Sequence, residues 1–443
     1  MRVAIVVAVV VLLLGTAPAD AQEPYNVTVN VTELSRIFTE LYGHEGLIVN
    51  SLASLAGGVS HSAHFNSAFE SEFSQFGTAL TGQIVSLPLP APASGFTYQF
   101  DAGLGVFTRS TSTFGPILAE RADTIGARRV SLGFAYQRLA FDSISNMDLQ
   151  SVPAVFTHDN AELRGGREDV ITTVNSIDSE VTRSAAFVTY GVTNDLDLSI
   201  ALPYISADMV VTSDATIQRI GTTVPETHFF RAADDSIGDR RLFTAFGHSS
   251  GVGDITVRLK QAIRKNPQGG IALGLDMRLP TGDEQNLLGA GAAGVRPFAA
   301  FSSAWGPFAP HANVGYQWNG KSVLAGDVIG DVKADLPDQF VYAVGTDLSV
   351  NERFSVVFDW LGQRVLDSPR LLTTTFTATG VAGTVTLPDI TFEQVSYWSS
   401  AASIGFKANI ASRVLLDFNM RFRVSDNGLV DRVAPLMGVE WSF

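Results

Sequence analysis

Two short motifs in this sequence have residue types and spacings that could bind a cofactor or a metal. Residues 289–294 (GAGAAG) fit the letters of the GxGxxG pattern, which places a pyrophosphate at a helix N-terminus. No predicted strand leads into the motif and Pro297 blocks a following helix, so we interpret it as a glycine-rich loop. His61 and His64 could face one way on a helix, but no third ligand accompanies them, and a zinc site needs at least three protein ligands. The sequence therefore predicts no cofactor and no metal.

A hydrolase on the outside of a β-barrel would need His, Ser and Asn or Asp converging on one face. The best-placed histidine is His311, which is followed by Ala312 and Asn313, with no serine two places away. We find no catalytic constellation, and we do not expect an enzyme.

Charged residues form a third set, because many of them alternate with apolar residues along extended segments. In a strand, alternate side chains point to opposite faces, so these charges would share the face opposite the apolar one. In lipid a cationic member would cost about 2–4 kcal/mol at the bilayer midplane, so we predict that the set faces the lumen of a barrel. Ion pairing between strands explains any one member better than ligand contact does. The members are Asp254, Arg258, Lys260, Asp276, Arg278, Asp347, Asp359, Asp417, Arg421, Arg423 and Glu440.

Two apolar stripes near the N-terminus repeat at helical spacing. From Asn30, a candidate N-cap, to Gly43, a candidate stop, four apolar residues fall on one helix face. The second stripe consists of Phe65, Phe69, Phe73 and Phe76. Such aromatic stripes usually form core, and here they predict contact between an N-terminal plug and the barrel wall.

The last eleven residues, 433–443 (VAPLMGVEWSF), predict the closing strand of the barrel. Val433, Met437, Val439, Trp441 and Phe443 lie on one face, and the alternate places are mostly polar or small. The length fits the roughly 9–11 residues that a tilted strand needs to cross a bilayer. An aromatic end preceded by apolar residues at alternate places resembles the assembly signal of bacterial outer-membrane barrels, so Phe443 is predicted to be that signal, read by the barrel-assembly machinery.

The N-terminal end and the composition agree with export to the outer membrane. An apolar segment, 3–14, follows Arg2, and Ala19-Asp20-Ala21 has the small-x-small pattern of a signal-peptide cleavage site. After it no run of about 18 apolar residues appears, as a membrane helix would require. Yet 46% of residues are hydrophobic and the mean hydropathy is +0.19. There is no cysteine, so no disulfide or thiolate site is possible. A net charge of −14 argues against nucleic acid as a partner.

From residue 127 onward, alternating segments are separated by tight turns and by longer polar stretches. The turns are predicted at about 193–195, 266–269, 306–307, 351–353 and 411–412. The longer stretches, about 143–180, 205–251, 280–295, 319–338 and 365–394, are predicted to be extracellular loops, because outer-membrane barrels have short periplasmic turns and long outer loops.

The strand count must be even if the N-terminus of the barrel is periplasmic. We predict an all-β, transmembrane antiparallel barrel of about twelve strands in 127–443, after a signal peptide (1–21) and a partly helical plug or periplasmic segment (22–126). Apolar residues also take alternate places in 96–108, and this segment with a partner strand near 78–90 would give fourteen strands. Both strand counts remain open here.

Four runs carry a resemblance to a known family: 114–126 (FGPILAERADTIG), 190–204 (YGVTNDLDLSIALPY), 251–263 (GVGDITVRLKQAI) and 275–298 (LDMRLPTGDEQNLLGAGAAGVRPF). They resemble the bacterial outer-membrane transporters of the phenol-degradation MetA pathway, which are similar to FadL-type channels. The resemblance covers about residues 60–443. It implies passive uptake of hydrophobic small molecules, aromatic compounds or fatty acids, and an N-terminal hatch in the lumen. This chain lacks the family's Asn-Pro-rich mature N-terminus.

Together these features predict an outer-membrane channel of a Gram-negative-type bacterium, with membrane lipid and a hydrophobic small molecule as partners. The alternative is a barrel without transport, which would serve as a surface adhesin or structural protein. A channel predicts a path past the plug, whereas an adhesin predicts a sealed lumen.

Overall fold

The computed structural model describes residues 25–43, 46–52, 63–67, 69, 76, 79, 98–101, 106–109, 113–158 and 169–443, the last range without 222, 233, 267, 382 and 412. The expected signal peptide and Phe73 lie outside these residues. No helix among them is long and apolar enough to cross a membrane.

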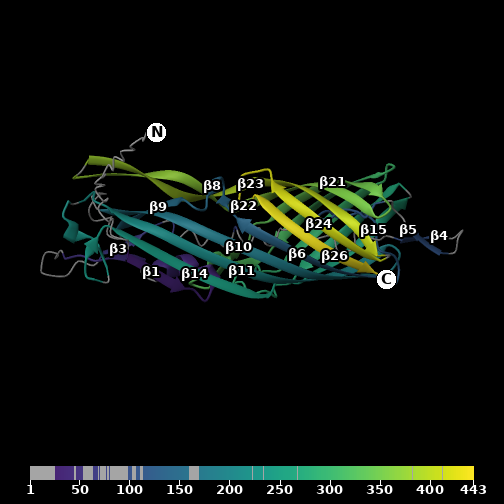
Figure 1. Ribbon diagram of the computed structural model, residues 1–443, viewed down its shortest axis with the longest axis horizontal. Coiled ribbons are helices and arrows are strands. Elements are labelled where there is room, and N and C mark those ends of the chain that lie inside the picture. Colours follow the sequence, from purple (N-terminus) through teal and green to yellow (C-terminus); the bar gives the residue numbers. More distant parts are fainter. Residues whose placement is uncertain are drawn as a thin grey trace, which may run out of the picture.

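Twelve antiparallel strands close into a barrel, as predicted (Figure 1). Each pairs with the next along the chain, and the last pairs with the first. They are β6 (Val130–Phe141), β10 (Val170–Gly191), β11 (Leu196–Gln218), β14 (Arg240–Val252) with β15 (Thr256–Asn266), β16 (Gly269–Arg278), β17 (Gly294–Ser303), β18 (Phe308–Asn319), β21 (Gln339–Asn351), β22 (Phe354–Gly380), β23 (Gly383–Ala411), β24 (Val414–Arg423) and β26 (Val433–Ser442). The strands β14 and β15 count as one, because both pair with β11 and only residues 253–255 separate them.

The fourteen-strand alternative is wrong. Residues 96–108 contribute β4 (Tyr98–Asp101), which pairs only with β5 (Val106–Arg109) in a separate two-stranded sheet. This hairpin lies beyond the end of the barrel at which the chain terminates (Figure 1). The short turns between strands lie at that same end, which is therefore the periplasmic one.

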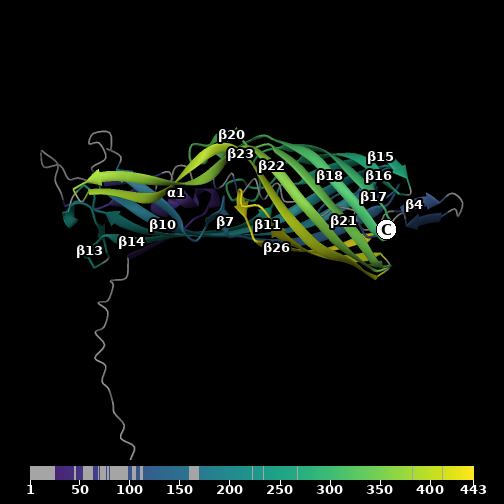
Figure 2. The same cartoon turned by 90° about the horizontal axis from the view of Figure 1, so that it is seen from above.

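Most of the long-loop predictions are wrong in part, because the strands continue through those residues. The strands β10, β11, β22 and β23 have 22, 23, 27 and 29 residues. About 9–11 residues suffice to cross the bilayer, so more than half of each strand projects beyond it. Figures 1 and 2 show this projection as a long, narrow continuation of the barrel. We call it the extension; it comprises the described residues within 25–79, 143–182, 206–249 and 366–396.

The polarity of the two strand faces inverts where the barrel becomes the extension. In the lower part of β10 the outward residues Val188 and Tyr190 are 47% and 42% exposed, as expected of side chains in lipid. Higher on the same strand the outward places hold Asp178 and Glu180, and the inward residue Ile177 is fully buried. Because the register is continuous between the two parts, the inversion marks the outer surface of the membrane. The chain is thus an outer-membrane barrel with an extracellular part that has an apolar core of its own.

The N-terminal segment fills the core of the extension. Strand β1 (Tyr25–Asn30) pairs in parallel with β14 above the membrane, and a 3₁₀ turn (Leu34–Arg36) leads into α1 (Ile37–Tyr42). The prediction that Asn30 caps the helix is wrong, because the chain is still extended there, but Gly43 does end it with a φ of 98°. Phe38 packs edge-on against Phe69 and Phe76, with ring centroids 5.7 and 5.6 Å apart.

The predicted phenylalanine stripe is not one continuous helix. Phe65 lies in β3 (Ala63–Asn66), which pairs with β2 (Leu47–Val49) and with β9 (Val152–His158). Phe65, Phe69 and Phe76 are all buried, and they join the core of the extension rather than the membrane-spanning lumen.

Shorter elements lie in the connections on the outer side of the barrel strands. They are β7 (Ser143–Ile144), β8 (Met147–Asp148), a 3₁₀ turn (Pro225–Thr227), β12 (Phe230–Arg231), β13 (Ile237–Gly238), β19 (Lys321–Asp327), β20 (Val332–Asp335) and β25 (Leu429–Val430). At the other end, Val130 and Phe443 exchange two backbone hydrogen bonds of 2.9 and 3.1 Å, which complete the pairing of the last strand with the first. The role of Phe443 in assembly remains a prediction.

Candidate functional site

The polar residues predicted to face the lumen lie on the side of the strands opposite the exposed apolar residues. Eight of the eleven are at most 9% exposed: Asp254, Arg258, Lys260, Asp276, Arg278, Asp347, Asp359 and Glu440. The other three are Asp417, Arg421 and Arg423, which are partly buried. The five tryptophans, in contrast, are 38–68% exposed and lie on the outward face or in a turn.

A segment without regular secondary structure, residues 113–126, crosses the lumen near its periplasmic end; we call it the strap. Thr113 Oγ1 donates to Asp347 Oδ2 on β21 (3.0 Å), at one wall. At the other wall, Thr124 Oγ1 donates to the carbonyl oxygen of Asn194, in the turn between β10 and β11 (2.6 Å). The strap ends against Gly191, where a Cβ would overlap the carbonyl oxygen of Gly126, so only glycine fits.

The middle of the strap is fixed by a charged network that joins four chain segments. Glu120 forms ion pairs with Arg258 and with Lys260 on β15, the second over 3.2 Å from Oε2 to Nζ. Arg258 is bidentate to Asp276 on β16, over 2.6 and 2.8 Å, and Asp276 also accepts from Arg296 on β17. The main chain of Glu120 is held as well, since its N–H and C=O both bond to the amide of Asn313 (2.6 and 2.7 Å).

A second anchor of the strap contains His311. Its Nε2 lies 2.6 Å from Asp359 Oδ1 and its Nδ1 lies 3.2 Å from Asp347 Oδ1, the residue that also binds Thr113. His311 is thus buried between two carboxylates inside the barrel, and not on the outer face where a barrel hydrolase would need it. Within the described residues, no group of His, Asp and Glu is placed to hold a metal ion.

The glycine motif at 289–294 has a packing role. Asp254, in the break between β14 and β15, accepts the backbone N–H groups of Gly282 (3.0 Å) and Ala290 (2.8 Å). These bonds fold the loop between β16 and β17 over the outer mouth of the lumen. Its residues Leu287 and Leu288 then join the same apolar core as α1.

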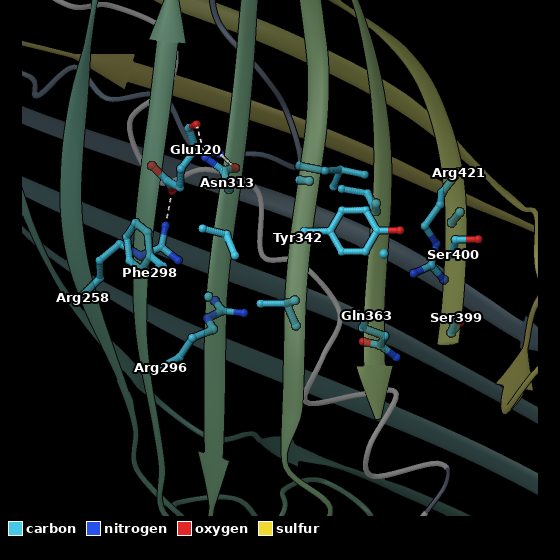
Figure 3. Close-up of a pocket in the computed structure, with 18 residues that line it drawn as sticks. Glu120, Arg258, Arg296, Phe298, Asn313, Tyr342, Gln363, Ser399, Ser400 and Arg421 are labelled. Atoms are coloured by element: carbon cyan, nitrogen blue, oxygen red, sulfur yellow. Dashed lines mark hydrogen bonds and ion pairs between the residues drawn. The ribbon is translucent and has the colours of Figure 1, made fainter. Parts of the chain in front are cut away.

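A cavity of about 150 Å³ lies beside the strap, next to the charged network of Glu120 and Arg258 (Figure 3). Its apolar lining comes from Leu118 on the strap and from Phe298, Val341, Ala343 and Leu361 on three strands of the wall, β17, β21 and β22. Its polar lining comes from the charged and amide side chains Glu120, Arg258, Arg296, Asn313, Gln363 and Arg421, with Ser399 and Ser400.

The wall of the cavity depends on an aromatic ring placed over glycines. Phe298 lies directly opposite Gly274 in the pairing of β16 with β17, and a Cβ on Gly274 would overlap its ring. Gly315 lies opposite Phe298 on β18, where a Cβ would lie 3.1 Å from the Cβ of Phe298. A large apolar side chain can therefore lie flat against the wall, and the guanidinium of Arg258 lies 5.0 Å from the ring centroid.

Sequence reasoning found the charges on the wall but missed Glu120, Arg296 and the strap that joins them. Arg296 is flanked along β17 by the apolar residues Val295 and Pro297, just as the predicted charges alternate with apolar residues, so alternation could have found it. Glu120 lies in an irregular segment, and its position gives no such signal.

Comparison with known proteins supports the resemblance. The sequence model of a family described as "Putative MetA-pathway of phenol degradation" matches residues 159–364. Three of the four runs quoted above lie in that range, and 114–126, the strap, lies outside it. The match is thus shorter than the range of about 60–443 that we expected. Comparison with curated proteins gives no match.

Solved structures of outer-membrane barrels are similar in fold. An outer membrane channel from Pseudomonas putida F1 has a TM-score of 0.44 and 12% identity, over 73% of this chain and 98% of that one. The P. putida toluene transporter TodX has a TM-score of 0.31 and 9% identity, over 71% and 89%. A Pseudomonas aeruginosa FadL homologue has a TM-score of 0.30 and 10% identity, over 71% and 89%. By the family model alone, the chain is similar over residues 159–364 to the family of the phenol-degradation MetA pathway, as its sequence predicted.

Proposed function

We propose that the barrel is a channel for passive uptake of hydrophobic small molecules of about the size of one aromatic ring. The observation that carries the proposal is the cavity beside the strap. A cavity of about 150 Å³ lined by apolar side chains accommodates benzene in other proteins, and this one has the same size. A long-chain fatty acid would exceed it, so the size favours aromatic compounds. The family match, which refers to phenol degradation, supports the same class.

The path for such a molecule would run from the extension, through the lumen, and past the strap. In this structure the strap lies across the periplasmic end, so it has to move or loosen when a molecule leaves. A surface adhesin, the alternative, would have no use for a cavity beside the strap.

Filling the cavity should stop uptake. Ala343 lines the cavity and is 7% exposed, whereas its neighbour Val344 points outward and is 54% exposed. Ala343→Trp should therefore lower uptake severalfold, and Val344→Trp should leave it unchanged. The measurement is uptake of a radiolabelled single-ring hydrocarbon by cells that express each variant in an intact outer membrane. Equal uptake by both variants would contradict the proposed path.

Loosening the strap should have the opposite effect. Glu120→Gln removes one carboxylate from a buried network with Arg258 and Lys260, and breaking a buried ion pair typically costs about 3–5 kcal/mol. The strap should then leave its seat more often, which would raise the single-channel conductance in planar bilayers. Glu180→Gln is the matched control, because Glu180 pairs with Arg138 on the outside of the barrel. A conductance of the E120Q variant equal to that of E180Q would mean that Glu120 does not hold the strap closed.

A further inference from the structure

The charged lining of the cavity is unequal in sign. Three arginines, Arg258, Arg296 and Arg421, line the cavity together with a single carboxylate, Glu120. Both oxygens of Glu120 are already engaged, Oε1 by Arg258 and Oε2 by Lys260. The lining therefore offers an incoming molecule many charged donors and no free charged acceptor from this carboxylate.

Two of these arginines retain donors beyond their own ion pairs. A guanidinium carries five N–H donors. Arg421 bonds to Asp431 Oδ1 through Nη2 (2.7 Å), and Arg296 bonds to Asp276 through Nε and Nη2. Among the described residues these are the hydrogen bonds that the two side chains make, so Nη1 of each remains available. Their side chains are 12% and 21% exposed, and both line the cavity (Figure 3).

The apolar lining lies in the same cavity. Leu118, Phe298, Val341 and Leu361 contribute side chains that cannot bond to a polar group, but that can cover an aromatic ring. A molecule that satisfies both kinds of lining has a ring at one end and an anionic oxygen at the other. A planar carboxylate also matches the fork geometry of a guanidinium.

We infer that the cavity is a selectivity site for single-ring aromatic carboxylates, in which Arg421, or Arg296 on the other side of the cavity, binds the carboxylate. This inference rests on the proposed function and narrows its substrate class from hydrophobic rings in general to acidic ones. Nothing in the inference requires a reaction: the carboxylate binds, its ring is covered, and the molecule leaves when the strap moves.

The test compares three probes of equal size and different charge: 4-fluorobenzoate, 4-fluorobenzyl alcohol and 4-fluorobenzylamine, at pH 8. Binding to the purified full-length barrel is followed by ¹⁹F NMR, and the filled-cavity variant A343W supplies the blank for partitioning into detergent. We expect the benzoate to bind about tenfold more tightly than the alcohol, because a hydrogen bond to a charged group is worth about that factor. The amine should not bind above the blank.

Variants then test which arginine binds the carboxylate. Arg421→Gln should lower benzoate affinity about tenfold and leave alcohol affinity unchanged, whereas Arg421→Lys should retain part of the preference. Arg364→Gln is the control, because that arginine lies outside the barrel over the ring of Trp398. If R421Q does not fold, the pair R421Q/D431N and the single variant R296Q carry the test.

The outcomes separate the inference from the proposed function. Equal binding of benzoate and alcohol in the wild type, or a benzoate preference that survives in R421Q and R296Q, would overturn the inference while the channel stands. Absence of binding above the A343W blank for all three probes would overturn both. Preference for the amine would also refute the inference.

Discussion

Val188→Arg should destabilise the folded barrel by about 2–4 kcal/mol, the cost of arginine on the lipid face near the midplane, whereas Val174→Arg should be almost neutral. Both valines are outward residues of β10, with exposures of 47% and 54%. The difference is their height on the strand. Val188 lies in the apolar belt, and Val174 lies in the extension directly opposite Asp214, where an arginine on the outward face would remain in water.

The measurement is urea unfolding of the two variants in lipid vesicles, followed by heat-modifiable migration of the folded barrel. The pair is closely matched, because residue type, strand, face and exposure are the same. A similar loss of stability for both variants would mean that the extension lies in lipid and that the inversion of polarity does not mark the membrane surface.

The same inversion explains which part of the fold could be predicted from the sequence. Alternation of apolar residues correctly predicted the membrane-spanning parts of the strands and their number. It failed above Ser184, because the apolar places of β10 change from even numbers, such as Val188, to odd numbers, such as Ile177. A search for one apolar face reads that change as the end of a strand, although the backbone pairing continues without a break.

The site was only partly predictable for a different reason. Period-two alternation tells which charges share the inner face, but the partners depend on strand register. The bidentate pair of Arg258 with Asp276 follows from the direct opposition of the two residues on β15 and β16. The strap has neither the period of a strand nor that of a helix. Its path across the lumen and the ion pairs of Glu120 therefore arise only from tertiary packing.

The packing of the N-terminal segment determines which experiment can test the path through the lumen. Removing residues 23–90 would not be a clean way to open the lumen, because the structure places Ile37, Phe38 and Leu41 in the apolar core of the extension. Their loss would expose that core and destabilise the whole protein. The strap is held to the wall by polar contacts and by small apolar clusters, all outside the core of the extension, so immobilising it in place is the cleaner experiment.

A reversible disulfide between the strap and the wall should abolish uptake. The chain has no cysteine, so introduced cysteines have no competing partner. Ala122 on the strap packs in one cluster with Ala272 on β16 and Ala300 on β17, so Ala122→Cys is combined with A272C in one variant and with A300C in another. A disulfide needs Cβ atoms about 3.5–4.5 Å apart, and mass spectrometry identifies the variant in which the bond forms.

The decisive measurement is uptake of the single-ring probe by that variant, oxidised and then reduced, with each single-cysteine variant as the control. If molecules pass through the lumen and leave past a moving strap, uptake falls to the background of cells without the barrel when the disulfide is closed, and reduction restores it. Uptake that is equal in the oxidised and reduced states, with the disulfide shown to be complete, would contradict the account.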